Sequence, residues 1–299
     1  MLFSPLTAEA KRLTLRQILA SGSIARFPGA FTPISTRLIE EQGFEGVYIS
    51  GGVLANELGF PDIGLTALPE VAARAGQIAR ITDLPAIVDA DTGFGEPVNV
   101  ARTIQELENA GLAGCHIEDQ VNPKRCGHLD GKTVVDLHTA TQRIRAAVEA
   151  RRDPNFLIMA RTDIRGVEGL NAAVDRAKAL VDAGADAIFP EAMAGLTEFE
   201  ALRAAVDVPI LANMTEFGKS DLFTVDRLQD AGVNMIIYPV TLLRASLGAM
   251  ERTLQTIQQD GTQQASVPHM LTRTRLYDLV DYEGYNDFDS GLFNFEVPA

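Results

Sequence analysis

Eight short apolar runs recur along the chain, and each is followed by a stretch with helical periodicity. The runs cover residues 26–31, 46–51, 85–90, 114–118, 156–161, 187–191, 209–213 and 235–238. Residues 156–160 and 235–238 are apolar at every position, as expected for parallel strands that are buried on both faces. In the stretch 169–184, Leu170, Ala173, Ala177 and Leu180 recur at intervals of three and four, which is typical of an amphipathic helix. The alternation predicts an α/β protein with parallel strands.

The number of these units favours a closed barrel. Eight strands with eight intervening helices predict a (β/α)8 (TIM) barrel. Three helical stretches end in Ala-Gly just before a strand, where glycine is the expected C-terminal cap (residues 110–111, 183–184 and 231–232). An open doubly wound sheet is the alternative, disfavoured because no Gly-x-Gly-x-x-Gly follows an early strand.

The barrel pattern fills one domain over residues 1–299, a length that such barrels commonly have. Residues 8–20 predict a helix before the first strand. After the eighth barrel helix, at about 241–259, residues 272–282 predict another.

Charge and cysteine content exclude several classes of partner. The net charge is −14, from 26 basic and 40 acidic residues, which argues against nucleic acid and anionic membranes. An anionic substrate stays compatible, because a few arginines or a metal can reverse the sign within one cleft. Two cysteines make no disulfide framework, the first residues lack a secretory pattern, and no apolar run approaches the ~18 residues of a membrane helix. We expect a cytoplasmic protein.

One cysteine lies in a basic loop. Cys126 has Lys124, Arg125 and His128 as neighbours, and nearby cations favour a reactive thiolate. Gly127 allows the backbone to approach a ligand closely. The alternative is a solvated surface loop. Cys115, in contrast, stands among apolar residues and is expected to be buried and structural.

Polar side chains gather where the predicted strands end. In a barrel these ends form the active-site face. Simple helix caps would be Ser, Thr, Asp or Asn, whereas Arg and Glu also occur here, so their convergence predicts an active site. The residues are Tyr48, Ser50, Asp89, Asp91, Glu118, Arg161, Asp163, Glu191, Asn213, Thr215 and Tyr238.

Asp89 and Asp91 predict a metal site. Alternation along a strand places both carboxylates on one side, where they would repel each other without a cation. Magnesium prefers one or two carboxylates together with waters. Glu118 and Asp62 are candidates for holding coordinated waters. The alternative is that Asp91 caps the turn at residues 92–93.

Two further strand ends predict contacts to an anionic substrate. Arg161 suits a bidentate clamp on a carboxylate, and a salt bridge to Glu191 or Asp163 is the alternative. Residues 48–52 combine a phenol, a hydroxyl and two glycine amides, a plausible nest for a carboxylate. His116 is expected to be a core histidine.

Seven segments together resemble the isocitrate lyase and phosphoenolpyruvate mutase superfamily and, within it, the 2-methylisocitrate lyases. They are residues 48–52 (YISGG), 88–95 (VDADTGFG), 116–120 (HIEDQ), 124–128 (KRCGH), 160–163 (ARTD), 189–192 (FPEA) and 211–218 (LANMTEFG). The KRCGH loop resembles the carbon–carbon lyases and not the decarboxylating or phosphonate-handling members. A barrel without catalytic activity would be expected to lack some charged strand ends, and none is missing.

The resemblance implies a Mg2+-dependent (or Mn2+-dependent) cleavage of 2-methylisocitrate to pyruvate and succinate, a step of propionate catabolism. It places the metal on Asp89 and Asp91, with Asp62 and Glu118 acting through waters. Cys126 matches the catalytic acid, Lys124 and His128 would offset negative charge, and Tyr48 with Arg161 would handle the substrate hydroxyl proton. The implied substrate contacts are Ser50, Gly51, Gly52, Cys126, Gly127, Arg161, Glu191, Asn213, Met214, Thr215, Arg244 and Arg273.

The predicted substrate and the predicted assembly each have an alternative. Phe189 with Ile237 would form an apolar pocket for a substrate methyl group, but one methylene changes binding by only ~1–3 kcal/mol, so isocitrate or 2,3-dimethylmalate are alternative substrates. Leu276 and Leu279 belong to an apolar stripe on the last predicted helix. The resemblance implies that this helix is exchanged between subunits of a homotetramer, and folding onto its own barrel is the alternative.

Overall fold

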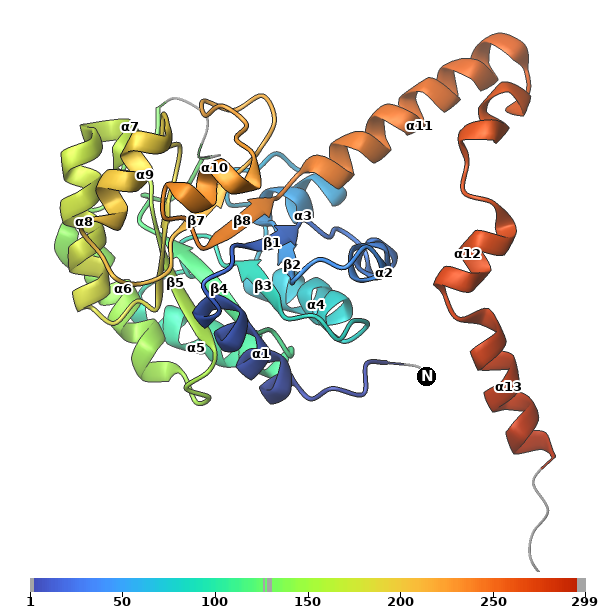
Figure 1. Ribbon diagram of the computed structural model, residues 1–299, viewed down its shortest axis with the longest axis horizontal. Coiled ribbons are helices and arrows are strands. Elements are labelled where there is room, and N and C mark those ends of the chain that lie inside the picture. Colours follow the sequence, from blue (N-terminus) through green and yellow to red (C-terminus); the bar gives the residue numbers. More distant parts are fainter. Residues whose placement is uncertain (1–2, 126, 128–130, 295–299) are drawn as a thin grey trace, which may run out of the picture.

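A computed structural model of the chain describes residues 3–125, 127 and 131–294 (Figure 1). The described strands, all parallel to their neighbours, correspond to the eight predicted ones. They are β1 (Ala25–Pro28), β2 (Val47–Ile49), β3 (Ala86–Asp89), β4 (Gly114–Glu118), β5 (Leu157–Thr162), β6 (Ala187–Pro190), β7 (Leu211–Asn213) and β8 (Met235–Tyr238).

The strands follow one another in a ring. One sheet has the order β2-β3-β4-β5-β6, and a second has the order β1-β8-β7. Isolated parallel bridges join the two sheets at both seams, Gly29 with Tyr48 and Ile188 with Ile210. At these seams Ala30 N donates to Tyr48 O at 2.8 Å, and Ile188 N donates to Pro209 O at 2.9 Å. The predicted α/β barrel order is confirmed.

Helices surround this ring and extend beyond it. They are α1 (Ala8–Ala20), α2 (Pro33–Glu41), α3 (Gly51–Glu57), α4 (Leu68–Ala79), α5 (Pro97–Asn109), α6 (Leu137–Ala150), α7 (Arg165–Glu168), α8 (Leu170–Asp182), α9 (Leu196–Arg203), α10 (Val225–Asp230), α11 (Thr241–Asp260), the 3-10 helix η1 (Gln264–His269), α12 (Arg273–Leu279) and α13 (Tyr282–Phe293). Gly111 and Gly184 have φ of 86° and 104°, as required for the predicted glycine caps. None of the described helices is both long and apolar enough to cross a bilayer.

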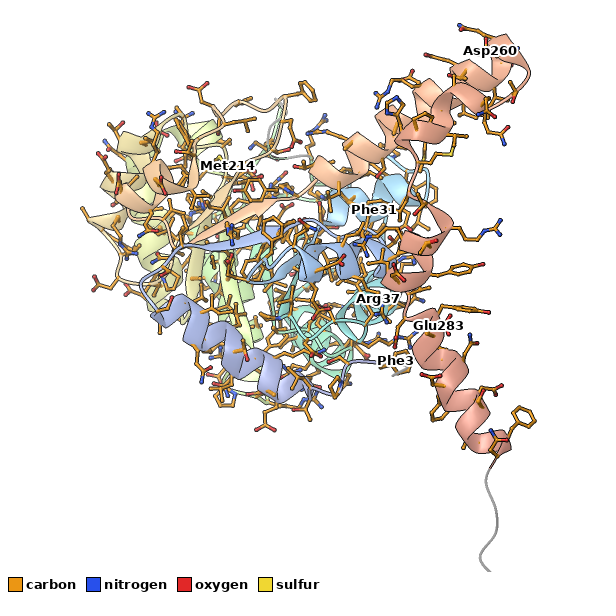
Figure 2. All side chains as sticks on the ribbon, turned by 45° about the vertical axis from the view of Figure 1, so that its right-hand side comes forward. Phe3, Phe31, Arg37, Met214, Asp260 and Glu283 are labelled. Carbon is orange, nitrogen blue, oxygen red and sulfur yellow. The ribbon has the colours of Figure 1, made fainter. Side chains whose placement is uncertain are left out.

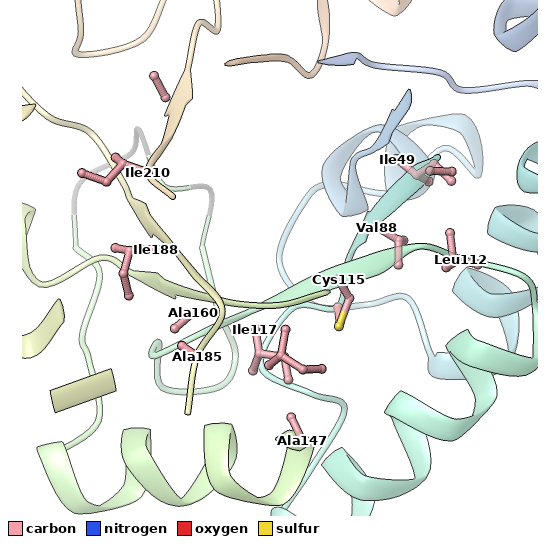
Figure 3. Close-up of a cluster of buried hydrophobic side chains, with 14 of the residues drawn as sticks. Ile49, Val88, Leu112, Cys115, Ile117, Ala147, Ala160, Ala185, Ile188 and Ile210 are labelled. Atoms are coloured by element: carbon pink, nitrogen blue, oxygen red, sulfur yellow. The ribbon is translucent and has the colours of Figure 1, made fainter. Parts of the chain in front are cut away.

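Two hydrophobic layers hold the barrel together. Inside the ring, Phe27, Leu157, Phe189 and Leu211 pack with Leu15 of α1. Between the ring and its helices lies a larger cluster in which Cys115 and Ile117 point outward from β4 (Figure 3). Successive residues of each strand therefore serve opposite layers. Cys115 is a free, buried cysteine, as predicted.

Helix α1 covers the amino-terminal ends of the strands. Lys11 Nζ donates to Ala79 O at 2.9 Å, and Arg12 Nε donates to Leu112 O at 2.9 Å. Arg16 donates from Nη2 to Phe156 O at 3.2 Å. These side chains satisfy carbonyl groups that would otherwise be buried without a donor. The polar residues at the carboxyl ends of the strands lie at the opposite end of the barrel.

The eighth barrel helix departs from the prediction. Helix α11 has nearly the predicted bounds, but its only buried residue is Leu243, and the helix runs away from the barrel (Figures 1 and 2). The chain then returns, and Arg275 of α12 pairs with Glu41 of α2. The helix predicted at 272–282 is present as α12 but ends at Leu279, and Asp281, with φ of 57°, separates it from a further helix, α13.

Candidate active site

A polar cavity of about 210 Å³ opens at the carboxyl ends of the strands, as predicted for a barrel. Its lining comes from β2, β3, β5, β6 and β7 and from the segments that follow β2, β4, β6, β7 and β8. The lining residues are Tyr48, Ser50, Gly52, Asn56, Asp62, Asp89, Gly127, Arg161, Phe189, Glu191, Asn213, Thr215, Glu216, Phe217, Gly218, Pro239, Val240 and Arg244.

Three buried carboxyl groups at or just after the ends of β3 and β4 have shifted pKa values, and the shifts differ in direction. Burial opposes ionisation of Asp89, but the surrounding charged groups, among them Lys124 and Arg161, lower its pKa. Burial and the neighbouring Asp89 raise the pKa of Asp91 to about 6. Burial raises the pKa of Glu118 well above its ordinary value, and neither of its carboxylate oxygens accepts a hydrogen bond from the described residues.

The ammonium group of Lys124 lies among these carboxylates. It is 2.8 Å from Asp91 Oδ1 and also pairs with Asp62, and the side chain is only 3% exposed. Burial disfavours the charged amine, but Asp91 and Asp89 outweigh it and raise the pKa of Lys124. A buried cation therefore already balances the acidic cluster.

The residues fit a hard divalent cation. Asp89, Asp91, Asp62 and Glu118 offer oxygen ligands alone, the set that Mg2+ prefers, and the Glu118 oxygens lack donors. Within the described part of the chain, no three Asp, Glu, His or Cys side chains converge as a ready ligand set. The Lys124 ammonium occupies the space beside Asp91 and Asp62, so a bound cation would have to displace it.

Arg161 lines the cavity from β5, the strand that pairs with β4. Its guanidinium contacts Asp163 at 3.0 Å, Glu191 at 3.2 Å and Glu118 at 3.3 Å, and it lies 5.1 Å from the ring centroid of Phe189. Burial opposes the charge, but these carboxylates raise the pKa of Arg161 well above its ordinary value. The predicted salt bridges to Asp163 and Glu191 are both present, and the group lines the cavity, where it can bind a carboxylate.

Tyr48 and His116 form a buried pair below the cavity. The Tyr48 hydroxyl and His116 Nε2 are 2.8 Å apart, and burial lowers the pKa of His116 to about 4. His116 is thus a neutral core histidine, as expected. Burial also raises the pKa of Tyr48 well above its ordinary value. The phenol keeps its proton, which disfavours a tyrosinate base at this position.

The glycines after β2 let the chain approach its own carboxylates. A Cβ at Gly51 would lie 3.1 Å from Asp89 Oδ2 and from Asp91 Oδ1, and one at Gly52 would lie 2.8 Å from Asp62 Oδ2. Gly51 N donates to Asp89 Oδ2 at 3.3 Å. The amide of Gly51 thus serves Asp89, whereas a substrate carboxylate was expected there.

Comparisons with known proteins agree with this geometry. A family model described as Phosphoenolpyruvate phosphomutase matches residues 15–258. The chain belongs to this family. A Corynebacterium glutamicum protein named "Probable 2-methylisocitrate lyase 2" is 58% identical over 100% of the chain and 97% of that protein, and a 2-methylisocitrate lyase of Aeropyrum pernix is 48% identical over 94% and 91%.

Solved structures place this family member in the phosphoenolpyruvate mutase/isocitrate lyase superfamily. A 2,3-dimethylmalate lyase of that superfamily aligns with a TM-score of 0.89 at 32% identity, covering 99% of this chain and 100% of the other. An oxaloacetate acetylhydrolase aligns with a TM-score of 0.90 at 32% identity, covering 97% and 99%. The expected enzyme class, a lyase, is confirmed by the names of the sequence relatives.

Most of the family-derived substrate contacts meet in the cavity. Ser50, Gly52, Gly127, Arg161, Glu191, Asn213, Thr215 and Arg244 all line it. Arg244 Nη1 donates to Thr215 Oγ1 at 3.2 Å, and Asn213 Nδ2 lies 3.4 Å from both oxygens of Glu191. Cys126 and His128 lie outside the described residues.

Three of the expected residues, Met214, Arg273 and Ile237, do not line the cavity of their own chain. Met214 points outward because it alternates with Asn213 and Thr215, and its sulfur accepts from Phe223 N (Figure 2). Arg273 belongs to α12 and does not line the cavity of its own chain. Ile237 is fully buried in the inner core, so the apolar wall is formed by Phe189 with Pro239 and Val240.

Tyr238 also turns away from the site. It packs beside Phe44 in a groove on the outside of the barrel, because it alternates with the inward-facing Ile237.

Three residues at or beside the site were not among the predicted site residues. Asn56 reaches the cavity from α3, a helix that the sequence did not predict. Phe217 is 96% exposed at the cavity mouth, with the Arg244 guanidinium 5.5 Å from its ring centroid. Lys132 lies within the cysteine loop region, and its partner Asp163 is 31 residues away along the chain.

Proposed function

We propose that this chain cleaves 2-methylisocitrate to pyruvate and succinate in a Mg2+-dependent reaction. One observation carries the proposal: the carboxylates Asp62 and Asp89 and the donors Arg161, Asn213 and Arg244 line the same cavity. Such a cavity suits a metal-chelating polycarboxylate. The names of relatives at 58% and 48% identity specify which polycarboxylate to test first.

Asp89 and Asp91 would hold the metal, with Asp62 and Glu118 contacting it through waters. A bound Mg2+ would supply Lewis-acid stabilisation of the oxygens on the pyruvate side of the substrate. Lys124 would be released from Asp91 when the cation binds. Its charge would then be available to the negatively charged substrate.

The cleavage requires two proton movements. The substrate hydroxyl loses its proton as the pyruvate carbonyl forms, and the carbon on the succinate side gains a proton as the C–C bond breaks. Cys126 is the proposed donor of the second proton, by resemblance, and the hydroxyl proton restores the thiol over the full turnover. Tyr48, which keeps its own proton, would orient the substrate hydroxyl beside Arg161.

A coupled assay of pyruvate release from 2-methylisocitrate tests this function. We expect turnover with Mg2+ or Mn2+, loss of turnover after chelation with EDTA, and recovery when the metal returns. Glyoxylate release from isocitrate and pyruvate release from 2,3-dimethylmalate should be slower. Full turnover by the metal-free protein would contradict the metal dependence, and faster cleavage of either alternative would reassign the substrate.

The cysteine provides a second test. Cys126→Ser should lower kcat by at least ~10²-fold, the usual scale for a missing general acid. Substrate binding should persist, because Arg161 and the metal ligands are unchanged. Near-normal turnover by this variant would exclude the thiol as the acid.

We also propose a homotetramer in which neighbouring subunits exchange their carboxyl-terminal helices. Helix α11 carries exposed apolar residues at helical spacing, Leu247, Met250, Leu254 and Ile257. Beside its root lies an apolar groove of about 370 Å³ lined by residues that include Leu38, Ile39, Phe44, Val225 and Leu242. An exposed apolar stripe of this kind favours association with another copy of the chain, and a cytoplasmic location completes the proposal.

A further inference from the structure

Lys132 holds a buried position beside the site that no proposed step uses. Its side chain is 4% exposed, and its ammonium group is 2.8 Å from Asp163 Oδ1. The same group donates to the carbonyl oxygen of Gly127. A buried ammonium needs such partners because burial without them would cost several kcal/mol.

The backbone of Lys132 is itself fixed. Residues 119–121 and 133–135 pair in antiparallel fashion: Val121 N donates to Thr133 O at 2.9 Å, and Val135 N donates to Asp119 O at 2.8 Å. Lys132 is the last residue of the segment enclosed by this pairing, directly before Thr133. Its side chain therefore reaches from a rigid base toward Gly127.

Gly127 is packed tightly against the substrate-binding side of the cavity. A Cβ at this position would lie 2.5 Å from Arg161 Nη2 and 2.5 Å from Glu191 Cγ. The residue is buried and lines the cavity. Only glycine can bring the backbone this close to Arg161 and Glu191.

Asp163 connects this contact to the arginine. Asp163 accepts from Arg161 Nε at 3.0 Å and Nη2 at 3.2 Å, and from Lys132 Nζ at 2.8 Å. One carboxylate thus orients the guanidinium and binds the cation that holds Gly127. Lys132 and Arg161 share the counter-charge of Asp163, so one ionic cluster contacts both Gly127 and the arginine.

We propose that Lys132 is a positioning residue that fixes Gly127 over the site and couples its place to the orientation of Arg161. Lys132 does not itself line the cavity, so it acts on the site through Asp163 and through Gly127, an expected substrate contact that does line it. The expected effect on turnover rests on the proposed function, whereas the anchoring of Gly127 by Lys132 does not.

Hydrogen–deuterium exchange tests the structural part without any turnover. In Lys132→Met, which keeps the apolar stem but removes the ammonium, we expect at least ~tenfold faster exchange in peptides that contain Gly127. Lys132→Arg should restore part of the protection, because its guanidinium can still donate to both oxygens. Lys132→Gln serves as the second variant if Lys132→Met does not fold.

Lys11→Met is the matched control. Lys11 is also a buried lysine, and its ammonium also donates to backbone carbonyls, but it lies under the opposite end of the barrel. This variant should leave exchange around Gly127 unchanged. Equal exchange around Gly127 in folded Lys132→Met and the unaltered protein would overturn the anchoring role.

Kinetics test the coupling to the site. Because a misplacement of about 1 Å can cost ~10²-fold in rate, we expect Lys132→Met to lower kcat by about that factor while KM changes less. A KM increase with normal kcat would overturn positioning of the reacting groups. If the unaltered protein turns over none of the three substrates, the proposed function fails, whereas the exchange result still decides the anchoring role.

Discussion

At the scale of single residues, the neighbouring carboxyl groups of the site have pKa values shifted in different directions. The surrounding charged groups lower the pKa of Asp89, burial and Asp89 raise the pKa of Asp91 to about 6, and burial raises the pKa of Glu118 well above its ordinary value. Three full negative charges at these positions would repel strongly in a poorly screened interior. A divalent cation would change this balance by favouring the ionised form of each.

The two cysteines should differ in reactivity. Burial raises the pKa of Cys115 and its side chain is only 1% exposed, so the native protein should protect it from iodoacetamide. Cys126 should be alkylated, with loss of activity. Mass spectrometry of peptides from native and urea-unfolded protein measures both sites. A label on Cys115 in the native protein would show that its strand opens more readily than the packing implies.

Sequence periodicity could predict single residues only where alternation along a strand is regular. It placed Asp89, Arg161 and Asn213 at one end of the barrel, because every second residue faces the same way. The same rule would have excluded Met214, which the resemblance suggested. Lys132 could not be predicted, because its role depends on Asp163 and Gly127, which meet it only in three dimensions.

At the scale of elements, α1 is a part of the barrel core. Leu15 is fully buried and packs with Phe27, Leu157 and Leu211. Leu15→Ala should lower the free energy of unfolding by about 2–5 kcal/mol through lost burial and a cavity. Urea unfolding measures this loss, and Leu13→Ala, at a 48% exposed position on the same helix, is the matched control. Equal losses in both variants would contradict the assignment of the loss to core packing, since alanine is at least as good a helix former as leucine.

An ion pair at the start of β1 should make stability depend on pH. Glu45 accepts from Arg26 N at 2.8 Å and Nε at 2.9 Å, and although burial opposes it, these contacts lower the pKa of Glu45. Because the pKa of Glu45 is lower in the folded state, its ionised form stabilises the fold at pH values above its ordinary pKa of 4.5. This stabilisation is lost as the pH falls through the pKa of the folded state. Glu45→Gln should therefore be less stable than the unaltered protein near pH 7, and the difference should disappear in acid.

Urea unfolding midpoints of Glu45→Gln and the unaltered protein at several pH values test this direction. A stability difference between them that grows toward low pH would contradict the prediction. The pair is partly exposed, so added salt should also reduce the difference at neutral pH.

Element boundaries were predictable where periodicity and caps agree. Helix α8 at Leu170–Asp182 lies within the predicted stretch 169–184, because its apolar face and its terminal glycine indicate the same limits. The break between α12 and α13 has no such signal, since Asp281 adopts a positive φ without being glycine. Helix α3 starts at two glycines, which have poor helix propensity, and close contact with Asp89 and Asp62 explains their presence.

At the scale of the whole molecule, apolar periodicity predicted α11 but not its surroundings. A stripe at intervals of three and four shows that a helix has an apolar face, and it does not say which chain covers that face. The extension of α11 away from the barrel could therefore not be read from the sequence (Figure 1).

Removing the segment after Gln264 should lower both assembly size and activity if this arm joins subunits. Sedimentation velocity measures the first and pyruvate release the second. The control is a chain ending at Asn294, which keeps η1, α12 and α13. A shortened protein that sediments as the same assembly and turns over normally would exclude helix exchange as a functional requirement.

The contacts of α1 also bear on how the chain is made. Helix α1 leaves the ribosome first, since synthesis runs from the amino terminus. Its partners come much later: Arg12 binds the Leu112 carbonyl, and Arg16 binds the Phe156 carbonyl and Asp186. During synthesis the apolar face around Leu15 therefore has no complete docking surface until more than half of the chain has emerged. A nascent chain stalled before Asp186 should for that reason be a target for chaperones at its amino-terminal end.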